Sequence, residues 1–149
     1  MAQASYRPGD FTVDGSLRDV CVLDVGISEW QSVIRALAET GWEHTLELTA
    51  SEPIAEPSAE AIFDRLQSDE KASARLAVRV GSVWFTSYFF DPSEIEFSFD
   101  PADTSSETEF RSLEEFMKWL ANVCHKPVVM TMESSTEHRT IPALLEISP

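Results

Sequence analysis

The sequence predicts an α+β fold in which about three helices pack against one face of a mainly antiparallel sheet. Several short segments alternate apolar and polar residues, a pattern typical of antiparallel strands with one solvated face. Most of these segments are joined by short turns, and three helical segments are dispersed between groups of strands. The chain has 149 residues and no long or low-complexity linker, so we expect one domain that covers residues 1–149.

The chain is expected to begin with an irregular arm followed by a hairpin. Residues 11–13 are expected to pair with the apolar run 17–25 across a turn formed by residues 14–16, which include Gly15. Cys21 in this run and Cys124 in the third helix are expected to be buried and reduced, because a chain of this length and composition needs no disulfide.

The next two elements are a helix and a strand. A first helix is predicted over residues 29–40, because Ser28 and Gln31 have the spacing of a capping box and an apolar stripe follows at helical spacing. Gly41 suits the left-handed residue that ends a helix. Residues 42–50 then alternate strictly, which predicts a strand with one solvated face.

A second, short helix is predicted after the capping residue Ser58, with Ile62, Phe63 and Leu66 facing inward. A three-stranded meander follows over residues 75–80, 83–90 and 94–100. Its strands are separated by a two-residue turn at Gly81 and by a second turn at residues 91–93.

An acidic loop is expected over residues 101–110, before the third helix. Ser112 and Glu115 have capping-box spacing, and the apolar stripe of this helix runs from Leu113 to Cys124. Residues 128–133 are then predicted to form a strand, and residues 134–137 a turn. The last extended stretch, residues 141–147, contains Pro142 and therefore suits the edge of a sheet.

Charge limits the classes of partner. Eleven basic against 26 acidic residues give a net charge of −15, which disfavours broad contact with nucleic acid or with anionic membranes. Residues 91–115 contain nine acids and only Arg111 as a base, a net charge of −8 in 25 residues. Such a concentration can attract a basic partner, and the plain alternative is a solvated acidic face that keeps the protein soluble.

Aromatic residues supply the second clue about partners. Residues 83–90 place Val83, Phe85 and Phe89 on one face of their strand and Trp84, Tyr88 and Phe90 on the other. If the second face is open, Trp84 and Tyr88 are suitable anchors for a protein interface, whereas the N-terminal arm or the second helix would otherwise cover them. The predicted partner-binding residues are Trp84, Tyr88, Glu94, Glu96, Asp100, Asp103, Glu107 and Glu109.

No motif indicates catalysis, so we expect no enzyme, no catalytic residues, no metal site and no cofactor. The five glycines are scattered and form neither a P-loop nor a dinucleotide-binding fingerprint. Cys124 and His125 are an isolated pair, and His44 is expected to bond a backbone group rather than to catalyse. Glu94 and Glu96 share a strand face, but such pairs are usually only solvated.

Two segments give the chain a family resemblance: residues 10–20 (DFTVDGSLRDV), and a helix–strand unit from residues 112–116 (SLEEF) to 126–133 (KPVVMTME). With its small size and acidic character, the chain resembles the immunity proteins that bacteria encode beside secreted or contact-delivered toxins. That resemblance implies a non-enzymatic inhibitor that binds one protein toxin, and an acidic inhibitor suits a basic toxin. No binding residue is carried over from it.

The expected setting is the cytoplasm, because the first residues lack the apolar segment of a secretory signal. The expected partner is a cognate toxin, with the chain as a monomer or homodimer. The alternative function is that of an acidic secretion chaperone, which would bind an effector segment as a dimer. That class opens with a helix, whereas this chain is predicted to open with a hairpin.

Overall fold

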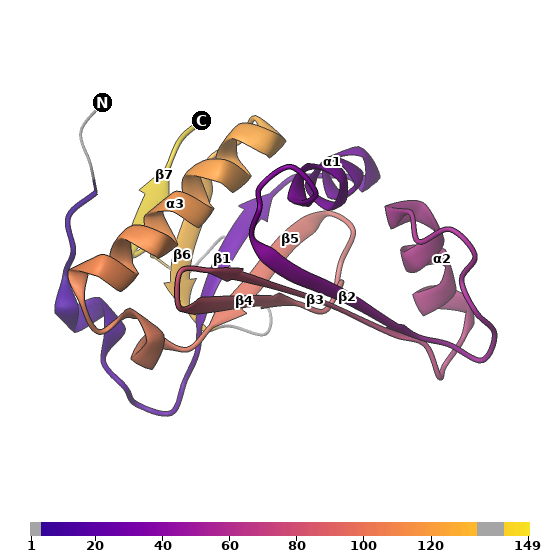
Figure 1. Cartoon of the computed structure of the whole chain (residues 1–149), viewed down its shortest axis with the longest axis horizontal. Coiled ribbons are helices and arrows are strands. Elements are labelled where there is room, and N and C mark those ends of the chain that lie inside the picture. Colours follow the sequence, from indigo (N-terminus) through magenta and orange to yellow (C-terminus); the bar gives the residue numbers. More distant parts are fainter. Residues whose placement is uncertain (1–3, 134–141) are drawn as a thin grey trace.

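The computed structural model describes residues 4–133 and 142–149, and it confirms the α+β prediction. One antiparallel sheet of seven strands has the order β2-β3-β4-β5-β1-β6-β7 (Figure 1). The strands are β1 (Arg18–Leu23), β2 (Glu43–Thr49), β3 (Ser73–Val80), β4 (Val83–Ser87), β5 (Glu94–Phe99), β6 (Val128–Met132) and β7 (Leu145–Ile147). The helices are α1 (Ile27–Leu37), α2 (Ala59–Ser68) and α3 (Glu107–Cys124), with short 3₁₀ turns η1 (Pro8–Phe11) and η2 (Pro101–Thr104).

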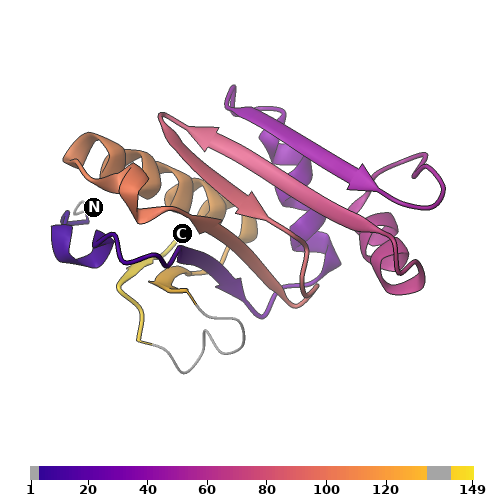
Figure 2. The same ribbon diagram turned by 90° about the horizontal axis from the view of Figure 1, so that it is seen from below.

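All three α-helices lie on the same side of the sheet. Figure 2 shows the sheet from the opposite side, with α1 and α3 behind the strands. We call this second side the open face, because no helix of the described residues covers it. Inward-facing residues of β4 and β5 are buried, whereas outward-facing ones are partly or largely exposed, so burial follows the period of two that the sequence predicts.

Aromatic rings fill the core between helices and sheet. Phe116 of α3 stacks on Phe85 of β4 with ring centroids 4.0 Å apart, and it meets Phe97 of β5 edge-on at 5.1 Å. A second cluster forms around Trp30 of α1, whose ring contacts Phe63 and Phe89. Such pairs add directional contact to the apolar burial that holds the layers together.

The predicted meander is confirmed as β3, β4 and β5, although β4 ends at Ser87 rather than at residue 90. The turn between β3 and β4 requires glycine, because Gly81 has φ = +62°. A Cβ atom at Gly81 would also lie 2.5 Å from Oγ of Ser112 in α3. This turn therefore packs directly against the helix layer.

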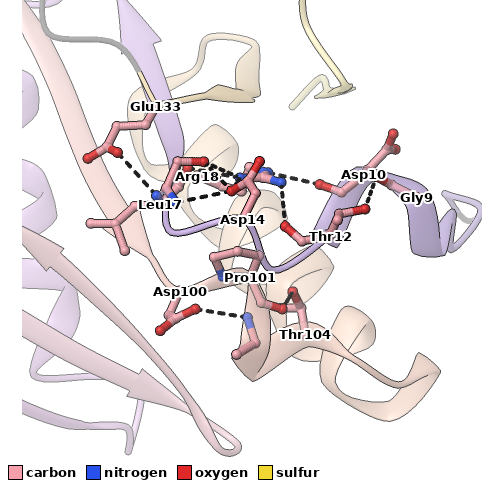
Figure 3. Close-up of polar contacts among 12 residues, drawn as sticks. Gly9, Asp10, Thr12, Asp14, Leu17, Arg18, Asp100, Pro101, Thr104 and Glu133 are labelled. Carbon is pink, nitrogen blue, oxygen red and sulfur yellow. Dashed lines mark hydrogen bonds and ion pairs between the residues drawn. The ribbon is translucent and has the colours of Figure 1, made fainter.

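The predicted N-terminal hairpin is wrong, and a buried arginine explains why. Residues 11–13 form no strand; instead Phe11 ends η1 and packs into the core against Phe99 and Phe110. The guanidinium of Arg18 in β1 donates hydrogen bonds to the carbonyls of Asp10 (2.9 Å) and Thr12 (3.0 Å), as Figure 3 shows. A side chain thus satisfies the carbonyl groups that a paired strand would otherwise have satisfied.

The Arg18 side chain is almost completely buried, with 1% of its surface exposed. It also donates to Oγ of Ser16 and to the carbonyl of Leu17, and its charge lies 3.7 Å from the Asp14 carboxylate. A buried cation is tolerated when acceptors surround it in this way. Arg18 therefore connects the N-terminal arm to the centre of the sheet.

Two helix starts differ from the prediction. Helix α1 begins at Ile27, because Gly26 occupies the N-cap position, and Oε1 of Gln31 accepts a hydrogen bond from the Ala59 N–H rather than closing a capping box. Helix α3 begins at Glu107, inside the expected loop. Oγ of Ser106 accepts from the Glu109 N–H and donates to the Glu109 carboxylate, so the N-cap residue is Ser106, six residues before Ser112.

The other elements agree with the sequence. Ser58 caps α2 through the N–H of Ala61, and β2 and β6 lie within their predicted ranges. The last stretch forms only β7, at the edge of the sheet beside β6. The predicted turn at 134–137 lies outside the described residues.

Replacing Arg18 by methionine is expected to lower the free energy of unfolding by about 2–3 kcal/mol, because charged hydrogen bonds are lost and carbonyls are left without donors. Urea denaturation monitored by circular dichroism measures this loss. The matched control is Arg7→Met, because Arg7 is exposed and its ion pair with Asp10 is 3.8 Å long. The control substitution should lower the free energy of unfolding by less than about 1 kcal/mol. Equal urea denaturation midpoints for Arg18→Met and the wild type would contradict the stabilising role of Arg18.

Candidate functional site

Three aromatic side chains project from the open face. Trp84 of β4 is 37% exposed, and Tyr88 and Phe90, which follow β4, are 46% and 75% exposed. Within the residues that the structure describes, neither candidate cover reaches them. The N-terminal arm packs on the helix side of the sheet, where Tyr6 contacts Phe110, and α2 packs against α1 and β3. Side chains of this size are normally buried in an interface or core, so their exposure makes the open face a candidate binding surface.

The backbone at Phe89 is strained where it separates Tyr88 from Phe90. Phe89 has φ = 58°, a conformation that bulky residues rarely adopt. Its ring is nevertheless held in the core, stacked on Trp30 with centroids 4.8 Å apart. On the open face, the rings of Tyr88 and Phe90 stack at 5.7 Å. Core packing at Phe89 thus fixes the position of an exposed aromatic pair, and strain of this kind is frequent at functional sites.

These aromatics border a groove of about 670 Å³ that runs across β4, β5 and β1. Its described lining consists of Leu17, Asp19, Trp84, Thr86, Tyr88, Phe90, Glu96, Ser98, Phe99, Asp100, Asp103 and Glu133. The structure therefore brings together five of the eight residues that the sequence singled out: Trp84, Tyr88, Glu96, Asp100 and Asp103. Adjacent strand pairing explains this, because Thr86 of β4 lies opposite Ser98 of β5.

Acidic side chains reach the groove from several elements. Asp19 of β1 lies opposite Ser98 in the register, and the Ser98 hydroxyl donates to its carboxylate at 3.0 Å. Asp100 and Asp103 come from the η2 turn, and the Asp100 carboxylate accepts the Ala102 N–H that starts this turn. Glu133 follows β6, and its carboxylate accepts the Leu17 N–H at 3.2 Å, as seen in Figure 3.

One of these acids, Asp103, is repelled by the carboxylates that lie near it. The pKa of Asp103 is raised above its ordinary value, first by burial and then by the neighbouring carboxylates of Asp100 and Glu109. Both causes disfavour the charged form of the side chain. A cation that entered the groove would relieve this repulsion.

Glu94 does not line the groove, but it lies beside it in a compact group with Cys21 and Glu96. The potential ligand atoms of the three residues lie within 4.8 Å of one another. Burial, and then the nearby carboxylates of Asp19, Glu94 and Glu96, raise the pKa of the Cys21 thiol far above its ordinary value. The thiolate is the form that attacks substrates and binds metal ions, and these surroundings disfavour it.

The last two predicted residues, Glu107 and Glu109, lie in the first turn of α3 and outside the groove lining. Glu107 forms an ion pair with Arg111 at 2.9 Å, whereas the Glu109 carboxylate accepts a hydrogen bond from the hydroxyl of the N-cap residue Ser106. Their local role is to stabilise the positive end of the helix. Glu114, farther along α3, is buried, and its carboxylate accepts hydrogen bonds from Arg111 and from the Ala4 N–H.

Several groove residues were not predicted from the sequence. Asp19 carries a signal that could have found it, namely an acidic residue next to Arg18 in a strand whose other residues are apolar. Phe90 was assigned to the correct face, but it was not counted as a partner-binding residue. Leu17 and Glu133 carry no local signal, because the groove receives them only through the pairing of β1 with β6.

Comparison of the chain with protein-family models, with curated proteins and with solved structures found no match. Among the helices that the structure describes, none has the length and apolar character needed to cross a membrane.

Both cysteines are free and buried, as expected, and their thiols should be unreactive in the folded chain. Burial and the nearby Glu29 carboxylate raise the pKa of Cys124 to about 12, and the pKa of Cys21 is raised further. At pH 8, Ellman's reagent should label neither thiol in the native chain but both in urea. An Ala55→Cys variant supplies an exposed control thiol. Native labelling as fast as that control would contradict the prediction.

Proposed function

We propose that the chain is an immunity protein, a non-enzymatic inhibitor that binds a cognate and basic protein toxin in the cytoplasm. The observation that carries the proposal is the groove on the open face, where exposed Trp84, Tyr88 and Phe90 lie beside five carboxylates. Exposed aromatic anchors bordered by charge are typical of protein interfaces. The resemblance of residues 10–20 and of the segment ending at residue 133 to immunity proteins agrees with this function.

Aromatic and acidic groups would make different contributions to such an interface. The rings of Trp84, Tyr88 and Phe90 supply apolar area that is removed from water on binding. The carboxylates supply a negative field that accelerates encounter with a positively charged partner and excludes acidic ones. A toxin that acts on nucleic acid needs a basic surface of its own, so an acidic inhibitor can cover that surface directly.

The chain should protect a bacterium from the toxin encoded beside its gene. The test is co-expression of this chain with the neighbouring reading frame, followed by isolation of a stoichiometric complex and measurement of cell survival. Survival together with a complex supports the proposal. A toxic neighbour that the chain neither binds nor neutralises would overturn it. A stable dimer in sedimentation that binds an unfolded segment of the neighbouring protein would favour the secretion-chaperone alternative.

Reversing three groove charges, with Glu96→Lys, Asp100→Lys and Asp103→Lys combined, should slow association with the toxin by about tenfold or more at low salt. The slowing should diminish as salt is added, because salt screens the field. The matched control combines Glu39→Lys, Glu56→Lys and Glu70→Lys, three exposed acids outside the groove lining, and changes the net charge by the same amount. Surface plasmon resonance measures both rates. Equal slowing in the two triple variants would show that only the net charge matters.

A further inference from the structure

We propose that the groove receives an arginine side chain of the basic partner, with the guanidinium against the aromatic rings and its N–H groups directed at the carboxylates. The inference rests on the proposed function, because it concerns the same surface, and it adds the chemical group that the surface recognises. Two features of the groove support it independently, namely its aromatic wall and its acidic rim.

The aromatic wall is suited to a flat cation. Trp84, Tyr88 and Phe90 all line the groove, and the last two rings already stack on each other. The face of an aromatic ring is electronegative and attracts a cation that lies over it. The chain itself shows this contact at Trp84, because the Arg79 guanidinium carbon lies 5.8 Å from the centre of the Trp84 ring.

The acidic rim is suited to a group with several donors. Asp19, Glu96, Asp100, Asp103 and Glu133 enter the groove, and its described lining contains no lysine or arginine. The neighbouring arginines of β3 are already engaged, because Arg75 pairs with Glu47 at 3.2 Å and Arg79 pairs with Glu43 at 3.3 Å. The described lining thus carries five carboxylates and no base, and the two arginines of β3 are paired with glutamates of β2.

Arginine fits this combination better than lysine or a small inorganic cation. A guanidinium is planar, is weakly hydrated and presents N–H groups in a fixed fork, so it can stack on a ring and bond carboxylates at the same time. An ammonium is compact and strongly hydrated, and it gains less from an aromatic wall. A groove of about 670 Å³ also exceeds what one ion needs, and it can accept a side chain with part of its backbone.

The test is a titration of the isotope-labelled full chain with the peptide acetyl-Gly-Arg-Gly-amide, followed by ¹H–¹⁵N NMR. The arginine peptide should shift the Trp84 indole N–H and the amides of Thr86 and Ser98 in a saturable manner. Matched peptides with citrulline, which has the same shape without the charge, and with lysine should bind more weakly by about tenfold or more. Protonation of Asp103 at low pH should weaken arginine binding as well, because it removes one of the attracting charges.

Two variants make the result specific to the groove. Trp84→Ala should reduce the affinity for the arginine peptide by about fivefold or more, whereas Trp84→Phe, which keeps a ring, should retain most of it. Both substitutions lie at an exposed position, so the fold should persist, and the unchanged NMR shifts of the core would show this. Equal binding of the lysine peptide, or shifts spread over exposed acids outside the groove such as Glu56 and Glu70, would overturn the inference.

The peptide titration and the toxin experiment test the two proposals separately. Arginine binding in the groove without protection from the toxin would refute the immunity function and leave the recognition of arginine intact. If the Trp84→Ala variant still protects the cell, and the chain does not bind the arginine peptide, the inference is refuted and the immunity function remains intact.

Discussion

The structure depends on the placement of all three helices on one side of a single antiparallel sheet. Each strand has an inner and an outer face, and one-sided coverage gives β4 and β5 a buried inner face and a partly exposed outer face, whereas β1 is buried on both. The division is most marked on β4 and the residues that follow it. Phe85 and Phe89 enter the core, whereas Trp84, Tyr88 and Phe90 remain outside it. The same packing that stabilises the fold therefore creates the surface proposed for binding.

Alternation of apolar and polar residues was sufficient to predict most of the fold. It identified β2, the meander β3–β5 and the split of aromatic residues on β4, because successive side chains of a strand point to opposite faces regardless of distant contacts. The alternation gave a wrong prediction where a hydrogen-bond partner distant in the fold replaced the expected neighbouring strand. Phe11 looked like part of a strand, but Arg18 satisfies the carbonyls on either side of it and a core aromatic cluster receives its ring.

The candidate site was predictable only in part, for a related reason. Local charge density pointed to Glu96, Asp100 and Asp103, which do line the groove, but equally to Glu107 and Glu109, which serve the start of α3. The density of negative charge along the sequence does not distinguish a carboxylate at a helix start from one that faces a groove. Asp19 and Glu133 join the groove from segments more than 110 residues apart, and only the pairing of β1 with β6 relates them.

The contacts of Arg18 have a consequence for how this protein can diverge. Its partners at residues 10, 12 and 17 are main-chain carbonyls, which every amino acid supplies. The side chains at residues 10, 12 and 17 can therefore change without removing these hydrogen bonds, whereas the core packing of Phe11 and the contacts of Asp14 and Ser16 with Arg18 depend on their side chains. Homologues that retain the arginine can then differ at these three positions and keep these hydrogen bonds of the arm.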